Sequence, residues 1–251
     1  MKIGIIGTGA IGGTIAKKMA EAGHIVKINN SDDLEKLNIR AKELGVTAAN
    51  KKDVVKDVDV IILSLPTIAI PTLPKDLFAE VPENVIVVDT SNYYPFRDAD
   101  IEEIKTGKVE SVWVSEQLGR PVIKAFNNLL AETLASGGKA PGAEDRIAMA
   151  IAGDDAYSKE VVAKLVNDAG YDVVDSGSLS ESWRHQPGTP AYCTELDAEE
   201  LKQALADGIK GEAPVKRDKA IADLSAMSSY PSHPDVVKFN RALFDKNPKT
   251  K

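Results

Sequence analysis

Short apolar runs alternate with longer amphipathic stretches over the first half of the chain. Runs of this kind are typical of strands buried on both faces of a parallel sheet. Two of the intervening stretches carry apolar residues on one helical face, and each is followed by a glycine that would end a helix. The predicted strands are Lys2–Ile6, Ile25–Ile28, Val46–Ala48, Val58–Leu65, Val85–Asp89 and Val122–Phe126, and the predicted helices are Ile11–Ala22 and Leu34–Leu44.

A doubly wound, mostly parallel α/β sheet is the fold that this alternation predicts. Leu134–Glu144 holds three glycines and a proline, so we expect a loop there. Beyond it the patterns predict a strand–helix–strand unit over Ile147–Ala152, Ala156–Asp168 and Tyr171–Asp175. An ordered loop is expected at His185–Tyr192 and a frayed tail at Asn247–Lys251. The helices predicted in the last part of the chain are Leu196–Ala206, Val215–Ala226 and Val236–Phe244. We therefore expect a sheet domain over residues 1–180 and a smaller loop and helical region over residues 181–251.

The charge and composition of the chain narrow its partners. Of its 251 residues, 31 are basic and 38 acidic, which gives a net charge of −7. Nucleic-acid binding needs a basic face, so we expect no nucleic-acid partner. No apolar run approaches the ~20 residues that span a bilayer, and the apolar N-terminal run is too short for a signal peptide, so we expect no membrane partner and a cytoplasmic location. One cysteine and three dispersed histidines predict neither a disulfide nor a metal site.

A glycine-rich turn separates the first predicted strand from the first predicted helix. It consists of Gly7, Thr8, Gly9, Ala10, Ile11 and Gly12. In such a turn the first glycine allows a tight exit from the strand, the second lets the backbone approach a pyrophosphate, and the third lets the helix pack closely. The helix N-terminus then offers free N–H groups to the phosphates. This context predicts a Rossmann domain that binds NAD(P).

The residues after the second predicted strand should contact the adenosine ribose of the dinucleotide. Asn30 and Ser31 can donate hydrogen bonds to the 2′-phosphate of NADP. Asp32 and Asp33 would repel that phosphate if they faced it, but the simpler interpretation is that both cap the following helix. The choice between NADP and NAD stays open on these residues.

Small and amide side chains follow three later strands, at the edge where ligands bind in such sheets. The candidate contacts to the nicotinamide and its ribose are Ser64, Leu65, Pro66, Asn92, Ala125 and Asn127. Since no nucleophile–base set, paired carboxylates or metal ligands are evident, no side chain is assigned a certain catalytic role. Hydride transfer between two bound cofactors requires positioning more than a protein acid or base.

Five conspicuous side chains receive plainer interpretations. Lys124 is expected to extend from its apolar strand toward solvent, and His185 to be a solvated loop residue. Cys193 has no basic neighbour in sequence that would lower its pKa, so we expect it to be unreactive. Trp113 and Trp183 are expected to pack in the protein rather than stack on a cofactor.

With these residues considered, the chain resembles the F420-dependent NADP oxidoreductase family, in particular its bacterial branch of predicted dinucleotide-binding proteins. The resemblance covers roughly residues 1–200 and rests on Ile3–Gly12, Val122–Asn127, Ala152–Asp155 followed by Gly170, and His185–Pro190. It implies bound NADP and a second flat redox partner, F420 or a flavin, beside Ala125–Asn127. The arginine usual in that family after the second strand is absent here, and Asn127 replaces a histidine.

The leading hypothesis is an NAD(P)-dependent oxidoreductase that transfers hydride between NADP(H) and a second, small-molecule redox acceptor, F420 or a flavin. One alternative is a dehydrogenase or reductase for a small carbonyl or imine, with His185 or Lys124 as proton donor. Another is a non-catalytic NAD(P) sensor whose partner binds residues 196–244. By analogy, a homodimer would form through the C-terminal helices.

Overall fold

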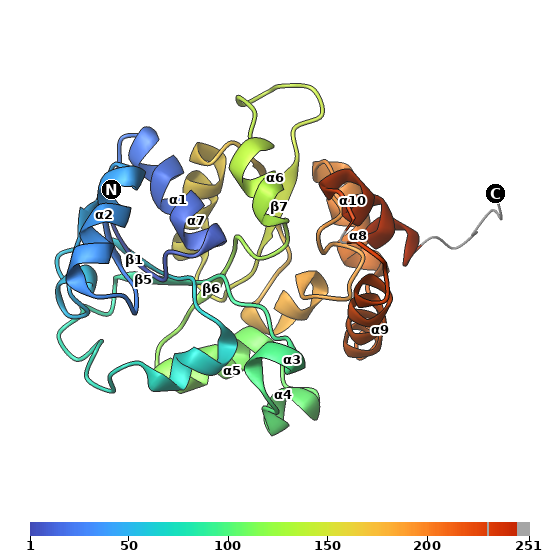
Figure 1. Ribbon diagram of the computed structural model, residues 1–251, viewed down its shortest axis with the longest axis horizontal. Helices are drawn as coiled ribbons and strands as arrows, with labels where there is room; N and C mark the ends of the chain where they lie inside the picture. The colour runs from blue at the N-terminus through green and yellow to red at the C-terminus, as the bar shows by residue number, and fades with distance from the viewer. Residues whose placement is uncertain (230, 245–251) are drawn as a thin grey trace.

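Six parallel strands form the main sheet of the protein. Figure 1 shows the computed structural model, which describes residues 1–229 and 231–244. The strand order is β3-β2-β1-β4-β5-β6, the order of a Rossmann fold, so the predicted fold class is confirmed. The strands are β1 (Lys2–Ile6), β2 (Ile25–Asn29), β3 (Thr47–Ala48), β4 (Val60–Leu63), β5 (Ile86–Asp89) and β6 (Ile123–Lys124). The predicted frayed tail, Asn247–Lys251, lies outside the described residues.

Two hydrophobic cores lie on opposite faces of this sheet, because successive strand side chains point to opposite faces. Ile62 packs in the first core, whereas Ile61 and Leu63 pack in the second. Helices α1 (Ala10–Glu21), α2 (Leu34–Leu44) and α7 (Ala156–Asp168) cover the first core. The second core is covered by the 3-10 helices η1 (Asp53–Val55) and η2 (Thr67–Thr72) and by α4 (Glu102–Lys105) and α5 (Glu110–Leu118).

A second, two-stranded parallel sheet follows β6. It pairs β7 (Ala148–Ile151) with β8 (Asp172–Asp175), and α7 connects the two strands. An antiparallel bridge joins the two sheets, where Lys124 and Ala152 exchange backbone hydrogen bonds of 2.8 and 3.0 Å. The predicted strand–helix–strand unit is therefore confirmed, and it forms a sheet of its own.

The described chain after β8 contains helices and no further strand. The 3-10 helix η3 (Leu179–His185) leads into α8 (Ala198–Asp207), which packs on β7 and β8. Helices α9 (Ala213–Ser225) and α10 (His233–Ala242) complete this region, drawn in red and orange at the right of Figure 1. The three predicted C-terminal helices are confirmed. None of the helices in the described chain is long and apolar enough to cross a bilayer.

The sequence prediction is least complete between β5 and β7. The pattern does not reveal α5, because its apolar residues Val112, Trp113 and Val114 are consecutive and show no helical period. It also does not reveal the short helix α3 (Pro95–Asp98). The loop predicted over Leu134–Glu144 is wrong in its first three residues, which belong to α6 (Ala131–Ser136) and precede the glycines.

Candidate functional site

The glycine-rich turn between β1 and α1 has a geometry that two of its glycines require. Gly7 adopts a φ of +98°, and a Cβ on it would lie 2.1 Å from the carbonyl oxygen of Ser64. A Cβ on Gly12 would lie 2.0 Å from the carbonyl oxygen of Gly7. The turn therefore packs directly against the end of β4, which brings Ser64 beside the start of α1.

Gly9 differs from its two neighbours in the turn. It is the N-cap residue of α1, with an ordinary φ of −65°, and no side chain caps the helix there. A Cβ on Gly9 would meet no protein atom within 4 Å, and the first turn of α1 holds no acidic residue. Free N–H groups at a helix N-terminus bind phosphate well. The open space over Gly9 therefore fits the pyrophosphate of a dinucleotide.

The end of β2 is joined to this turn by Asn30. Its Nδ2 donates to the Thr8 hydroxyl at 2.8 Å and to the Asp32 carboxylate at 2.7 Å. Asp33 caps α2 by accepting the Lys36 N–H at 2.9 Å. The interpretation of both aspartates as caps is thus correct for Asp33 and wrong for Asp32, which binds Asn30 instead.

A basic side chain that the sequence analysis did not single out also approaches the turn. The Arg40 guanidinium lies close enough to Gly13 that a Cβ there would be 2.7 Å from its Nη2. Arg40 also pairs with Glu43 at 3.1 Å on the same helix. Its place on α2, ten residues beyond Asn30, gives no local signal in the sequence.

Two predicted residues, Asn92 after β5 and Asn127 after β6, form one hydrogen-bond network that is partly buried at Asn92 and buried at Asn127. Asn127 Nδ2 donates to Asn92 Oδ1 at 2.9 Å and to the His185 carbonyl at 2.8 Å. Its Oδ1 accepts from His185 Nδ1 at 2.8 Å, so both amide hydrogens and the oxygen of Asn127 have protein partners. Asn92 in turn donates to the Asn127 carbonyl at 3.0 Å. Asn127 is thereby suited to hold the backbone and Asn92 in place.

His185 is fully buried, so its interpretation as a solvated loop residue is wrong. Its segment folds as the end of η3, under the chain that follows β6. Burial and the nearby Lys124 charge lower the pKa of His185 to about 3, so the ring is neutral at physiological pH. With Nδ1 donating to Asn127, Nε2 is left as an acceptor without a protein partner.

Lys124 is 1% exposed, so the expectation that it extends to solvent is also wrong. Its Nζ lies 3.0 Å from the Asp89 carboxylate and donates to the Ser91 carbonyl. Asp89 also accepts from the Ser111 hydroxyl at 2.7 Å and from the Ser91 N–H at 2.9 Å. Burying the Asp89 carboxylate would be costly without the hydrogen bonds and the ion pair that these partners supply. The ion pair fixes the ends of β5 and β6 relative to each other.

Glu110 adds a further buried carboxylate beside this ion pair. It begins α5 and accepts the Tyr93 N–H at 3.0 Å. Burial raises its pKa to about 7, and the charge of Lys124 opposes that rise only in part. The carboxyl group therefore titrates near neutral pH inside the protein.

Two tyrosines extend the network away from the strand ends. Asn92 Nδ2 donates to the Tyr192 hydroxyl at 3.3 Å, and the Tyr192 and Tyr94 hydroxyls lie 2.5 Å apart. The sequence analysis missed both. Tyr94 lies two residues beyond the predicted site residue Asn92, so the same strand end could have indicated it. Tyr192 ends the predicted loop His185–Tyr192 and follows no strand end, so no local signal marks it. The adjacent Cys193 is buried, and burial raises the pKa of its thiol to about 12, which favours the thiol over the nucleophilic thiolate at neutral pH.

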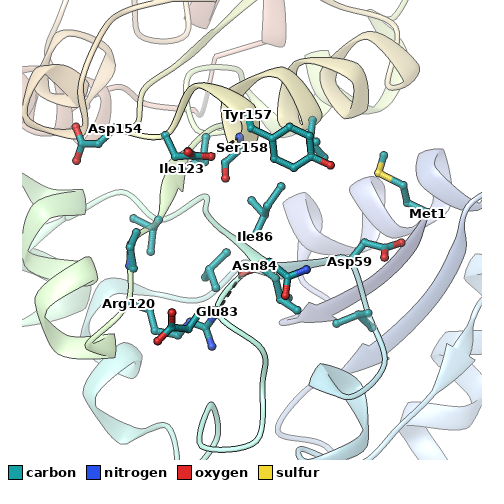
Figure 2. A pocket seen from close by; sticks show the side chains of 17 residues that line it. Met1, Asp59, Glu83, Asn84, Ile86, Arg120, Ile123, Asp154, Tyr157 and Ser158 are labelled. Carbon is teal, nitrogen blue, oxygen red and sulfur yellow. Dashed lines mark hydrogen bonds between the residues drawn. The ribbon is translucent and has the colours of Figure 1, made fainter.

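A cavity of about 760 Å³ lies elsewhere. Figure 2 shows it between the N-terminal end of α7, with Tyr157 and Ser158, and the segments that carry Asp59, Asn84 and Arg120. Its lining includes the residues that precede β4, β5 and β6, so it opens at the amino ends of the strands. Ligands of such sheets bind at the carboxyl ends. We therefore do not assign the dinucleotide to it.

The described residues hold no group of three or more histidine, cysteine or carboxylate side chains that could bind a metal ion. Trp113 and Trp183 are both buried, as expected of packing residues. The described chain thus offers an uncapped helix N-terminus with open space at Gly9, beside polar strand ends.

Comparison with known proteins agrees with this geometry. Residues 2–93 match the family described as NADP oxidoreductase, coenzyme F420-dependent. Over 102 residues, the chain is 38% identical to the putative protein YjhV of Escherichia coli K12, covering 41% of this chain and 74% of that one. The structure of a hypothetical protein from Sinorhizobium meliloti is 30% identical, covers 78% of this chain and 95% of its own, and superposes with a TM-score of 0.66.

The chain belongs to the F420-dependent NADP oxidoreductase family. It is accordingly an NAD(P)-dependent oxidoreductase. The structure of a putative F420-dependent NADP reductase from Arthrobacter sp. FB24 shares the fold at 23% identity, with a TM-score of 0.58 over 72% of this chain and 87% of that one. The family match ends at residue 93, before Asn127, His185 and Tyr192. The family match therefore supports the residues proposed to bind the dinucleotide up to Tyr93. It does not extend to the residues that would contact the hydride acceptor.

Proposed function

We propose that this oxidoreductase transfers a hydride between NADP(H) and a second, flat redox partner, F420 or a flavin. The observation that carries the proposal is the open cradle at Gly9 on the same sheet edge as Ser64, Asn92 and Asn127. That edge is where parallel sheets of this kind bind ligands. The region over residues 1–180 would bind the dinucleotide, and residues 181–251 would cover the partner.

Each part of the cofactor has residues suited to it. The turn Gly7–Gly12 would hold the pyrophosphate, and Asn30 with Ser31 would hold the 2′-phosphate of NADP. The residues after β4, β5 and β6 would lie along the nicotinamide and its ribose, namely Ser64, Leu65, Pro66, Asn92, Ala125 and Asn127. The nicotinamide itself supplies the hydride chemistry when bound, so the protein needs to orient it and exclude water. The Asn92–Asn127–His185 network supports that orientation, because its hydrogen bonds fix the positions of the two amides.

In this proposal, His185 and Lys124 serve the reaction by holding neighbouring residues in place and not by donating protons. His185 is neutral and its Nδ1 is committed to Asn127, while Lys124 is committed to Asp89. Neither therefore supports the alternative in which one of them donates a proton. Positioning of two bound reactants can by itself account for a large part of a rate enhancement.

Parallel titrations with NADPH and NADH, followed by nicotinamide fluorescence, test the proposal. We expect tighter binding of NADPH, followed by oxidation of the bound NADPH when F420 or a flavin is added. Preference for NADH would show that Asp32 contacts the ribose rather than Asn30. Binding of neither dinucleotide would contradict the proposal.

A further inference from the structure

The side chain of Arg40 reaches the glycine-rich turn from the neighbouring helix. Helices α1 and α2 pack against each other on the first core (Figure 1), and Arg40 precedes Ala41 of the buried face of α2. A Cβ on Gly13 would lie 2.7 Å from Arg40 Nη2 and 3.2 Å from the Thr8 carbonyl oxygen. Both atoms therefore border the space that Gly13 leaves free. Because Gly13 has no side chain, the guanidinium can lie beside Thr8.

The end of β2 meets the turn at the same residue. Asn30 donates to the Thr8 hydroxyl at 2.8 Å, so the Asn30 amide and the Arg40 guanidinium both approach the turn at Thr8. A dinucleotide that lies over such a turn places its adenosine ribose at the end of the second strand. There an acidic residue binds the 2′-hydroxyl of NAD, whereas a nearby arginine accommodates the 2′-phosphate of NADP. Arg40 is therefore a cation placed to favour NADP.

Asp32 is an acidic residue near the same strand end, but its carboxylate is already engaged. It accepts from Asn30 Nδ2 at 2.7 Å, and the Asp32 N–H donates to Asn30 Oδ1 at 2.9 Å. Arg40 instead pairs with Glu43, and these two side chains are 40% and 57% exposed. Exposed ion pairs contribute little to stability, so a phosphate can replace Glu43 as the partner of the guanidinium. A guanidinium can also donate two parallel hydrogen bonds to one phosphate.

Lys36 is an alternative cation, one turn before Arg40 on α2. Its side chain is 71% exposed, and its Nζ lies 3.4 Å from the Asp33 carboxylate at the start of the helix. The contacts of Lys36 therefore hold it at its own helix, whereas the Arg40 guanidinium already lies at the turn.

We propose that Arg40 selects NADP over NAD by binding the 2′-phosphate of the adenosine ribose together with Asn30 and Ser31. The inference rests on the proposed function, because that function makes NADP(H) the hydride donor. It assigns the selecting charge to the middle of α2, and not to the residues that directly follow β2.

The dissociation constants of NADPH and NADH, measured on the full chain by nicotinamide fluorescence, test this inference. Arg40→Gln should raise the constant for NADPH at least about tenfold, because a charge-assisted contact is lost, and change that for NADH less than about twofold. Lys42→Gln is the matched control. It removes the same charge from the same helix, but Lys42 is exposed and two residues away, where side chains do not share a face with Arg40. Lys42→Gln should bind both dinucleotides as the wild type does.

Gly13→Ala tests the same contact without changing the charge. Its methyl group would force the Arg40 guanidinium away from the turn, so we expect the affinity for NADPH to fall more than the affinity for NADH. In a chain that already carries Arg40→Gln, Gly13→Ala should affect the two dinucleotides equally. This variant also keeps the inference testable if Arg40→Gln fails to fold.

The outcomes separate this inference from the proposed function. If the wild-type chain binds neither dinucleotide, or prefers NADH, the proposed function and this inference both fail. The inference alone is overturned if the wild type prefers NADPH and Arg40→Gln keeps that preference. It is also overturned if Arg40→Gln and Lys42→Gln weaken NADPH binding equally, or if Lys36→Gln removes the preference and Arg40→Gln does not. Every measurement here is of binding, so a failure to reduce F420 or a flavin would contradict the proposed function alone.

Discussion

The three glycines of the β1–α1 turn look equivalent in the sequence but meet different surroundings in the structure. Gly7 and Gly12 are required by close backbone contacts, whereas Gly9 faces open space. The first two are therefore needed to fold the turn, and the third is needed only if a ligand occupies that space. This difference makes Gly9 the most informative position for testing the cofactor site.

Gly9→Ala should lower the affinity for NADPH at least tenfold and leave the fold intact. Its φ of −65° suits alanine, and the methyl group would meet no protein atom, so we expect the free energy of unfolding to change by less than about 1 kcal/mol. Fluorescence titration and urea unfolding measure the two quantities. Gly12→Ala is the contrasting variant and should lose stability as well as affinity. Unchanged NADPH binding by Gly9→Ala would show that the phosphates lie elsewhere.

The buried Glu110 carboxyl predicts a pH-dependent stability. Its pKa is about 7 in the folded protein, above the usual 4.5, so the folded state binds more protons than the unfolded state between those values. The contribution of this group to stability is therefore lost as the pH rises from about 4.5 to 7. Glu110→Gln removes that loss and keeps an acceptor for the Tyr93 N–H.

We expect Glu110→Gln to match the wild type in stability near pH 4 and to exceed it by on the order of 3 kcal/mol at pH 8. Urea unfolding at several pH values measures the difference. His185 opposes this trend in the wild type, because its lowered pKa makes stability fall as the pH drops below about 6.5. Both proteins contain His185, so the difference in their free energies of unfolding at the same pH does not include the His185 contribution. A stability difference between the two proteins that stays constant from pH 4 to pH 8 would contradict the raised pKa of Glu110.

At the scale of elements, the ends of β5 and β6 are held together by charge as well as by the sheet. The Lys124–Asp89 pair is buried at the carboxyl edge, where the proposed nicotinamide residues begin. Removing one partner of such a pair leaves an uncompensated buried charge, which is more costly than replacing both partners.

Lys124→Met should therefore destabilise the protein by about 3–5 kcal/mol. The double variant Lys124→Met with Asp89→Asn should recover a large part of that loss. Denaturant unfolding of the two single variants and the double variant forms the cycle that measures the coupling. Additive effects of the two substitutions would show that the pair does not act as a unit.

The same elements show what a sequence can and cannot predict. Strands such as β4 are buried on both faces, so an unbroken apolar run reveals them without knowledge of their neighbours. Asn92 and Asn127 could be placed at the site because each lies three residues beyond the end of a strand. His185 and Tyr192 could not, because they reach Asn127 and Asn92 across 58 and 100 residues of chain. Only the packing of η3 and its following loop against β6 brings them there, and no local pattern encodes that packing.

At the scale of the whole molecule, the dinucleotide should stabilise the fold as well as react in it. A ligand that binds only the folded state, at a concentration of 100 times its dissociation constant, adds about 2.7 kcal/mol to the free energy of unfolding. For a protein of this size we expect the melting temperature to rise by roughly 5–10 °C. Thermal unfolding with saturating NADPH measures this, with Gly9→Ala as the control that should show a much smaller shift. An equal shift in both proteins would indicate binding at another site.

The bridge between Lys124 and Ala152 has a consequence for how the protein behaves at high concentration. A sheet with a long free edge can recruit strands from other molecules and aggregate. Here one end of the main sheet is the two-residue strand β3, and the other is the two-residue strand β6, whose outer side is already occupied by the bridge. Neither end offers the extended backbone that edge-to-edge association needs, so the main sheet is protected against that route to aggregation.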